Sequence, residues 1–152
     1  MLHDFITNNA LFASFCAWAL AQLSKGVVAF SQGKGLRLKY LLGSGGMPSS
    51  HSAFVSALAT AVAVIDGLGS ITFAISVVMA LVVMYDAAGV RQSVSRQSRV
   101  INRIVKELAL GRHVTDLESD LRELVGHTPF QVFAGSAMGI VVALLWVTFI
   151  GA

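Results

Sequence analysis

The chain has 152 residues, of which 55% are hydrophobic and only 12% are charged. Soluble domains carry about 25% charged residues, so this chain has too little polar surface to cover a water-soluble globule. Its mean hydropathy of +0.74 favours an integral membrane protein, and we expect an all-α helical bundle that forms a single membrane domain over residues 1–152.

Four apolar stretches predict transmembrane helices, at about residues 5–30, 52–65, 68–85 and 130–150. The first lacks a preceding basic segment, which favours a retained helix over a cleaved signal peptide. The second is short for a hydrocarbon core of roughly 30 Å. It either reaches further through the preceding loop or remains a partial span packed inside the bundle.

Small residues recur at a spacing of four in two of these stretches, as Ala53, Ala57 and Ala61 and as Gly135 and Gly139. Such positions let helix backbones approach closely in lipid. We expect them to pack within the bundle, with homodimerisation as the less favoured alternative.

The basic residues predict the orientation in the membrane. All 11 Lys and Arg lie in two regions. Four lie from Lys25 to Lys39, at the end of the first span and in its connection to the second, and seven lie from Arg91 to Arg122, between the third and fourth spans. The positive-inside rule makes segments 31–51 and 86–129 cytoplasmic and places both termini on the outer side of a bacterial-type inner membrane or its equivalent. Because the basic residues lie between hydrophobic spans, they indicate anionic lipid head groups and not nucleic acid as their partner.

The second basic segment also carries a helical pattern. Apolar residues from Val94 to Leu108 recur at helical spacing among Arg and Lys, which predicts an amphipathic helix near the interface. Thr115 and Glu118 form a capping-box pattern before a second short helix that closes at Gly126.

The stretch GSGGMPSSHSAF, residues 43–54, is the most polar one next to a span. Its glycines, including Gly46, leave backbone amides accessible, and Ser49 or Ser50 can cap the helix that follows. A helix N-terminus with free N–H groups binds phosphate well, and His51 lies in its first turn. The alternative is a well-capped helix start with an incidental histidine at the membrane interface.

Further ionisable residues fall at the same predicted depth. His127 precedes the fourth span, Asp86 and Arg91 follow the third, and Lys25 lies near the end of the first. Lys25 alone would be expected to reach out to the interface, but the set as a whole predicts a phosphate site. No cluster with metal-ligand spacing indicates a metal, and no cofactor is expected.

The stretches GGMPSSHSA, YDAAGVR and GHTPFQVFAGSAMGI occur in this order over nearly the whole chain. They resemble the divergent branch of the phosphatidic acid phosphatase type 2 superfamily, which is related to acid phosphatases and vanadium-dependent haloperoxidases. In that superfamily one histidine protonates the leaving group and a later histidine is the nucleophile, while Lys and Arg hold the phosphate oxygens.

The resemblance implies a role for each candidate residue. It makes His51 the general acid and His127 the nucleophile, which would form a phosphohistidine. It makes Arg91 and Lys25 ligands of the phosphate, which the helix start at Gly46, Ser49 and Ser50 would cradle.

The chain departs from the superfamily at four points. Ser50 stands where the superfamily has glycine, and Gln131 stands where an aspartate orients the nucleophile. Arg91 is also further from the nucleophile than is usual, and the site is predicted to face the cytoplasm rather than the outside. Asp86 is the alternative orienting group for His127; it is equally compatible with pairing to Arg91 or Arg96 at the membrane boundary.

Three functions follow as hypotheses. The first is a metal-independent phosphatase for a lipid phosphate or a polyprenyl-type phosphate or diphosphate. The second is a degenerate relative that binds or moves a phospholipid head group or scaffolds a partner. The third is a structural, dimeric membrane protein that uses the Gly135–Gly139 face.

Overall fold

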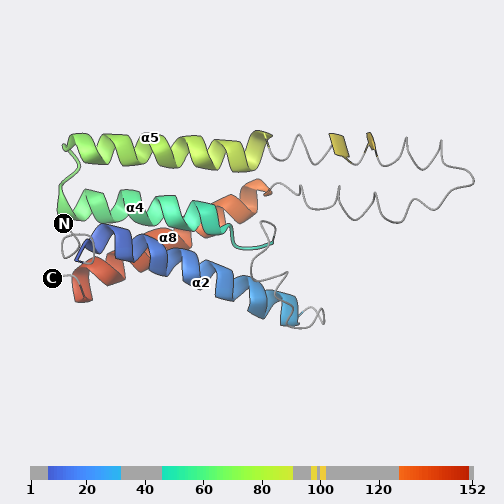
Figure 1. Cartoon of the computed structure of the whole chain (residues 1–152), viewed down its shortest axis with the longest axis horizontal. Helices are drawn as coiled ribbons and strands as arrows, with labels where there is room; N and C mark the ends of the chain where they lie inside the picture. Colours follow the sequence, from blue (N-terminus) through green and yellow to red (C-terminus); the bar gives the residue numbers. More distant parts are fainter. Residues whose placement is uncertain (1–6, 32–45, 91–96, 99, 102–126, 151–152) are drawn as a thin grey trace, which may run out of the picture.

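The computed structural model describes residues 7–31, 46–90, 97–98, 100–101 and 127–150. The bundle consists of four α-helices (Figure 1): α2 (Asn9–Ser31), α4 (Ser50–Ile65), α5 (Ile71–Tyr85) and α8 (Pro129–Phe149). A five-residue π-helix, η1 (Asp86–Val90), continues α5. No strand occurs in these ranges. The expected helical membrane bundle is therefore confirmed. The two amphipathic helices predicted between residues 94 and 126 lie mostly outside the described residues.

The four helices differ in how far they could extend across a bilayer. α2, the continuous helix Ile71–Gly89 and α8 are long and apolar enough to cross a membrane. α4 has 16 residues and is therefore about 24 Å long, less than a typical hydrocarbon core. The residues from Gly46 to Pro48 form bends and do not extend it.

α4 lies at the centre of the bundle. It contacts α2, α5 and α8, and α2 also contacts α8. Successive helices run in opposite directions (Figure 1). The C-terminal ends of α2 and α5 therefore lie at the same end of the bundle as the N-terminal ends of α4 and α8. This is the end that carries the candidate functional residues.

Small side chains make up the core. The fully buried hydrophobic residues are alanines on α2, α4 and α8: Ala13, Ala17, Ala21, Ala53, Ala57, Ala61 and Ala143. Within α2 and within α4 they are spaced by four, so each set forms one ridge along its helix. In lipid, where burying large apolar groups brings little gain, close backbone approach is what favours helix association.

Two glycines bring α8 against α4. A Cβ atom added at Gly135 would collide with the backbone carbonyl of Ser49, and one added at Gly139 would collide with that of Ala53. Only glycine fits at these crossing points. The predicted packing of the two glycines within the bundle is therefore confirmed.

A short turn joins α4 to α5 at the opposite end of the bundle. Gly67 has a φ of +87°, a conformation that residues with a side chain rarely adopt. Ser70 caps α5 by accepting a hydrogen bond from the N–H of Phe73 at 3.1 Å, and the Thr72 hydroxyl donates to the Asp66 carboxylate at 2.6 Å. The turn holds α4 and α5 as an antiparallel pair.

α5 shows most clearly which surface faces lipid. Only Ser76 and Ala80 are buried within it, whereas large apolar side chains such as Ile71, Ile75 and Val82 are well exposed. A surface of this composition is suited to hydrocarbon and not to water.

Candidate functional site

The start of α4 is a closely hydrogen-bonded helix N-terminus. Ser49 is the N-cap, and its hydroxyl accepts hydrogen bonds from the backbone N–H of Ser52 at 3.3 Å and from the Ser52 hydroxyl at 3.0 Å. The side chains of Ser49, Ser50 and Ser52 are fully buried. Gly46, with a φ of +92°, turns the chain into this cap in a conformation that favours glycine.

Lys25 reaches this N-terminus from α2. Its side chain is only 4% exposed, and its ammonium donates a hydrogen bond to the Ser50 hydroxyl at 3.0 Å. A Cβ atom at Gly46 would lie 3.9 Å from the Lys25 Cγ, so the backbone of Gly46 packs beside the stem of the lysine. The side chain of Lys25 therefore turns inward to the start of α4 and does not follow the alternative, in which it would reach out to the interface.

The start of α8 is joined to the start of α4. The backbone N–H of Ser49 donates to the carbonyl of Gln131 at 3.0 Å, and Gly135 permits close contact one turn further along α8. The N-termini of two helices therefore meet, and each contributes partial positive charge.

Gln131 also fixes the start of α8 and the ring of His127. Its side-chain Oε1 accepts a hydrogen bond from the backbone N–H of Thr128 at 3.0 Å and lies 3.2 Å from Nδ1 of His127. The hydroxyl of Thr128 accepts in return from the backbone N–H of Gln131, which completes a capping box.

These bonds determine the tautomer of His127. A backbone N–H can only donate, so the Gln131 atom that faces Thr128 is the amide oxygen. Nδ1 of His127 faces the same oxygen and must therefore carry a proton. In the neutral ring the lone pair is then on Nε2, the nitrogen that would act as nucleophile or base.

The backbone of His127 is held by η1. Its N–H donates to the carbonyl of Ala87 at 3.2 Å, and the residue is only 3% exposed. π-Helical turns occur frequently at functional sites. Here the turn presents a carbonyl to a residue that lies 40 positions later in the chain.

Asp86 begins η1 and is half-buried. Its backbone N–H donates to the carbonyls of Val82 and Val83 at the end of α5. Gln131, one of the two groups predicted to orient His127, lies within hydrogen-bond distance of the ring. Arg91 lies outside the described residues.

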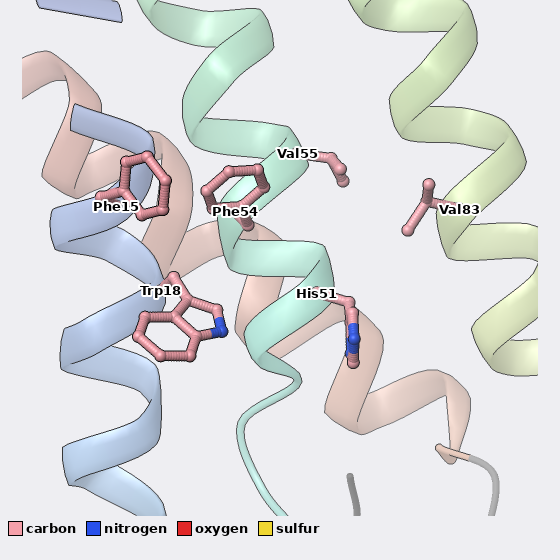
Figure 2. A pocket seen from close by; sticks show the side chains of 6 residues that line it. All are labelled: Phe15, Trp18, His51, Phe54, Val55 and Val83. Carbon is pink, nitrogen blue, oxygen red and sulfur yellow. The ribbon is translucent and has the colours of Figure 1, made fainter. Parts of the chain in front are cut away.

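His51 lies on another face of α4 from the buried serines. It is exposed and lines a pocket of about 400 Å³ with Phe15, Trp18, Phe54, Val55 and Val83. Figure 2 shows it projecting from the first turn of α4, on the side that faces Val83 of α5.

The structure thus joins most of the predicted site in one chain of contacts. Lys25 contacts Ser50, Ser49 contacts Gln131, and Gln131 contacts His127. Sequence reasoning missed Thr128 and Ala87. The spacing of Thr128 and Gln131 is a capping-box signal that could have revealed the first, whereas no local pattern indicates the carbonyl of Ala87.

The arrangement is chemically suited to an anion. A buried ammonium and two helix N-termini supply positive potential, and one histidine has a defined lone pair. Among the described residues, no three His, Cys, Asp or Glu side chains are grouped so that they could hold a metal ion.

Comparison with known proteins agrees with the resemblance seen in the motifs. The chain is 37% identical over 153 aligned positions to the uncharacterized membrane protein YuiD of Bacillus subtilis (strain 168), and the alignment covers 93% of this chain and 96% of that protein. No solved structure matches the chain significantly. The family model described as the divergent PAP2 family matches residues 6–142, and the chain therefore belongs to the divergent PAP2 family.

Proposed function

We propose that this membrane protein is a phosphatase for a lipid phosphate or a polyprenyl-type phosphate or diphosphate, and that it acts through a phosphohistidine. One observation carries the proposal. The buried ammonium of Lys25 at the start of α4 is linked, through Ser50, Ser49 and Gln131, to a histidine whose Nδ1 is held protonated.

The positive potential at the start of α4 supports an anionic ligand. The Lys25 ammonium reaches the Ser50 hydroxyl there, and the N-terminus of the helix adds partial positive charge. A phosphate group at this place would accept hydrogen bonds from Lys25, from Arg91 and from amides at the start of α4 near Gly46, Ser49 and Ser50.

The proposed reaction has two steps. In the first, Nε2 of His127 attacks phosphorus, a N–P bond forms and the bond from phosphorus to the lipid oxygen breaks. His51 donates its proton to that oxygen, and the lipid alcohol leaves, or the lipid monophosphate where the substrate is a diphosphate. In the second, water attacks phosphorus, His51 takes a proton from the water, and the N–P bond breaks to release inorganic phosphate. Lys25 and Arg91 stabilise the charge on the phosphate oxygens in both steps.

The amide of Gln131 sets the expected rate. It orients His127 in the same tautomer that a carboxylate would select, but it carries no charge to stabilise the positive ring formed by the attack. In the Ser-His-Asp triad, replacing the carboxylate with an amide lowers the rate about 10⁴-fold, largely through the wrong tautomer. Here the tautomer is correct, so we expect slow but measurable turnover.

The test is release of phosphate from purified protein. Phosphatidic acid and undecaprenyl phosphate are supplied in mixed micelles in the presence of EDTA, and wild type is compared with His127→Ala. We expect release by wild type, an acid-labile phosphate on His127, and loss of both in the variant. Phe130→Ala, which changes an exposed residue in the first turn of α8, is the matched control. Equal release by wild type and His127→Ala refutes the mechanism.

A second candidate function is favoured by the same neutral amide. A protein that keeps the phosphate site without the carboxylate can bind or move a lipid head group and leave it intact. Gln131→Asp separates the two. A large gain in phosphate release supports an enzyme slowed by its amide. Binding of phosphatidic acid with no release by wild type or Gln131→Asp supports the binding protein.

A further inference from the structure

An apolar pocket lies between three helices at the candidate site. Phe15 and Trp18 of α2, Phe54 and Val55 of α4, and Val83 of α5 line a volume of about 400 Å³, and His51 is the polar member of the lining (Figure 2). Pockets that bind small molecules commonly measure about 300–1,000 Å³ and combine apolar walls with a few polar groups.

The walls of the pocket are open toward lipid. Phe15 is 51% exposed and Trp18 is 39% exposed, and in Figure 2 their rings lie on the side of α4 that faces α2. Phe15 packs edge-to-face on Phe54, with their ring centroids 5.4 Å apart. Because the described helices around it are largely covered by exposed apolar side chains, the pocket is suited to hydrocarbon that enters sideways from the bilayer.

The pocket ends beside the candidate catalytic groups. Val83 lies four residues before Ala87 and so on the same face of the helix, about one turn away, and the carbonyl of Ala87 holds the backbone of His127. His51 directly follows Ser50, whose hydroxyl binds Lys25. A chain lying in the pocket would therefore end within a turn of both halves of the proposed phosphate site.

We propose that this pocket holds one hydrocarbon chain of the lipid substrate, at the end of the chain nearest the phosphate. The bound chain would thereby set the position of phosphorus relative to His127. The proposal rests on the proposed function. Moving a chain from bilayer to pocket gains little hydrophobic free energy, because both surroundings are apolar. The expected benefit is therefore orientation of the reacting group.

Photochemical labelling tests the proposal without requiring turnover. Full-length His127→Ala protein in phosphatidylcholine nanodiscs receives phosphatidic acid with a diazirine near the start of one acyl chain, or phosphatidylcholine with the same chain. After irradiation, we expect peptides containing Phe54 or Val83 to be labelled several-fold more by the phosphatidic acid. Undecaprenyl phosphate is then added as a competitor. If it lowers the labelling by phosphatidic acid, polyprenyl chains bind in the same pocket.

Filling the pocket supplies the second arm. Val83→Trp should lower, several-fold, the labelling of the α4 peptide by phosphatidic acid. Val82→Trp adds the same ring at a neighbouring position that is 63% exposed and does not line the pocket, and it should leave the label unchanged. In the enzyme with His127 intact, Val83→Trp should slow release from long-chain phosphatidic acid and spare release from a dibutyryl analogue.

The outcomes separate this proposal from the proposed function. Equal labelling by both head groups, or labelling that Val83→Trp does not reduce, overturns the pocket proposal even if His127-dependent phosphatase activity is found. Head-group-dependent labelling that Val83→Trp removes supports the pocket, and in a protein without phosphatase activity it assigns the pocket to a lipid-binding protein instead.

Discussion

The hydroxyl of Ser50 stands where the resemblance to the superfamily leads one to expect glycine, and the Lys25 ammonium donates to that hydroxyl at 3.0 Å. The other residue that replaces the one expected, Gln131, contacts His127. Both departures are therefore integrated into the site by hydrogen bonds. Each side chain contacts a neighbour whose charge or lone pair the proposed phosphate chemistry would use.

Removing the Ser50 hydroxyl should weaken substrate binding. A hydrogen bond to a charged group contributes about 1.5–3 kcal/mol, so in Ser50→Ala we expect a roughly ten- to hundredfold rise in the KM for phosphatidic acid. Ser50→Thr keeps the hydroxyl and is the matched variant, expected to lie close to wild type. The measurement is phosphate release as a function of substrate concentration in mixed micelles. A KM that is unchanged in Ser50→Ala shows that the hydroxyl does not position Lys25 for the substrate.

At the scale of the helices, the sequence predicts which segments are helical and which of their faces pack together better than it predicts where each helix ends. The alanine and glycine spacings of α4 and α8 identify the surfaces that pack, because small residues repeated every four positions have few other uses in an apolar helix. The π-helical continuation of α5 has no such signal. Its exposed carbonyl at Ala87 is used by His127, a partner 40 positions away, and a local sequence window contains no information about that contact.

The α4–α8 crossing should respond to a single methyl group. In Gly139→Ala the added Cβ collides with the backbone carbonyl of Ala53, which cannot move without shifting α4. Overpacking of this kind costs about 1–3 kcal/mol, so we expect a lower midpoint of thermal unfolding in detergent.

Ala137→Val is the matched control for this crossing. It enlarges an exposed residue of the same helix and should leave the midpoint near that of wild type. If Gly139→Ala is as stable as Ala137→Val, the two helices are not in backbone contact at this position.

At the scale of the whole molecule, the short helix α4 is enclosed by the three long ones. The sequence offers four spans of different length and leaves open whether the second crosses fully, because length alone does not say which helix is central. The predicted clustering of the candidate site residues at one end of the bundle follows from the alternating direction of the spans. Successive spans alternate in direction, so residues at the end of one and the start of the next lie at the same depth. The partners within that cluster depend on packing and could not be predicted.

The orientation of this end in the membrane is a separate prediction, and it follows from charge. Seven Lys and Arg lie between Arg91 and Arg122, and none lies in the turn between α4 and α5. Each basic residue near an anionic cytoplasmic leaflet contributes about 1 kcal/mol of attraction. The combined bias should hold the candidate site at the cytoplasmic surface and the Gly67 turn outside.

Cysteine labelling in intact spheroplasts measures this orientation. Cys16 is the single native cysteine, and Cys16→Ser provides the background for Leu68→Cys in the outer turn and Ser93→Cys in the basic segment. A membrane-impermeant maleimide should label Leu68→Cys before lysis and Ser93→Cys only after it. Since Leu68 is 73% exposed, a lack of label there before lysis cannot be ascribed to burial. Labelling of Ser93→Cys alone before lysis would reverse the orientation, and the proposed phosphatase would then draw its substrate from the outer leaflet.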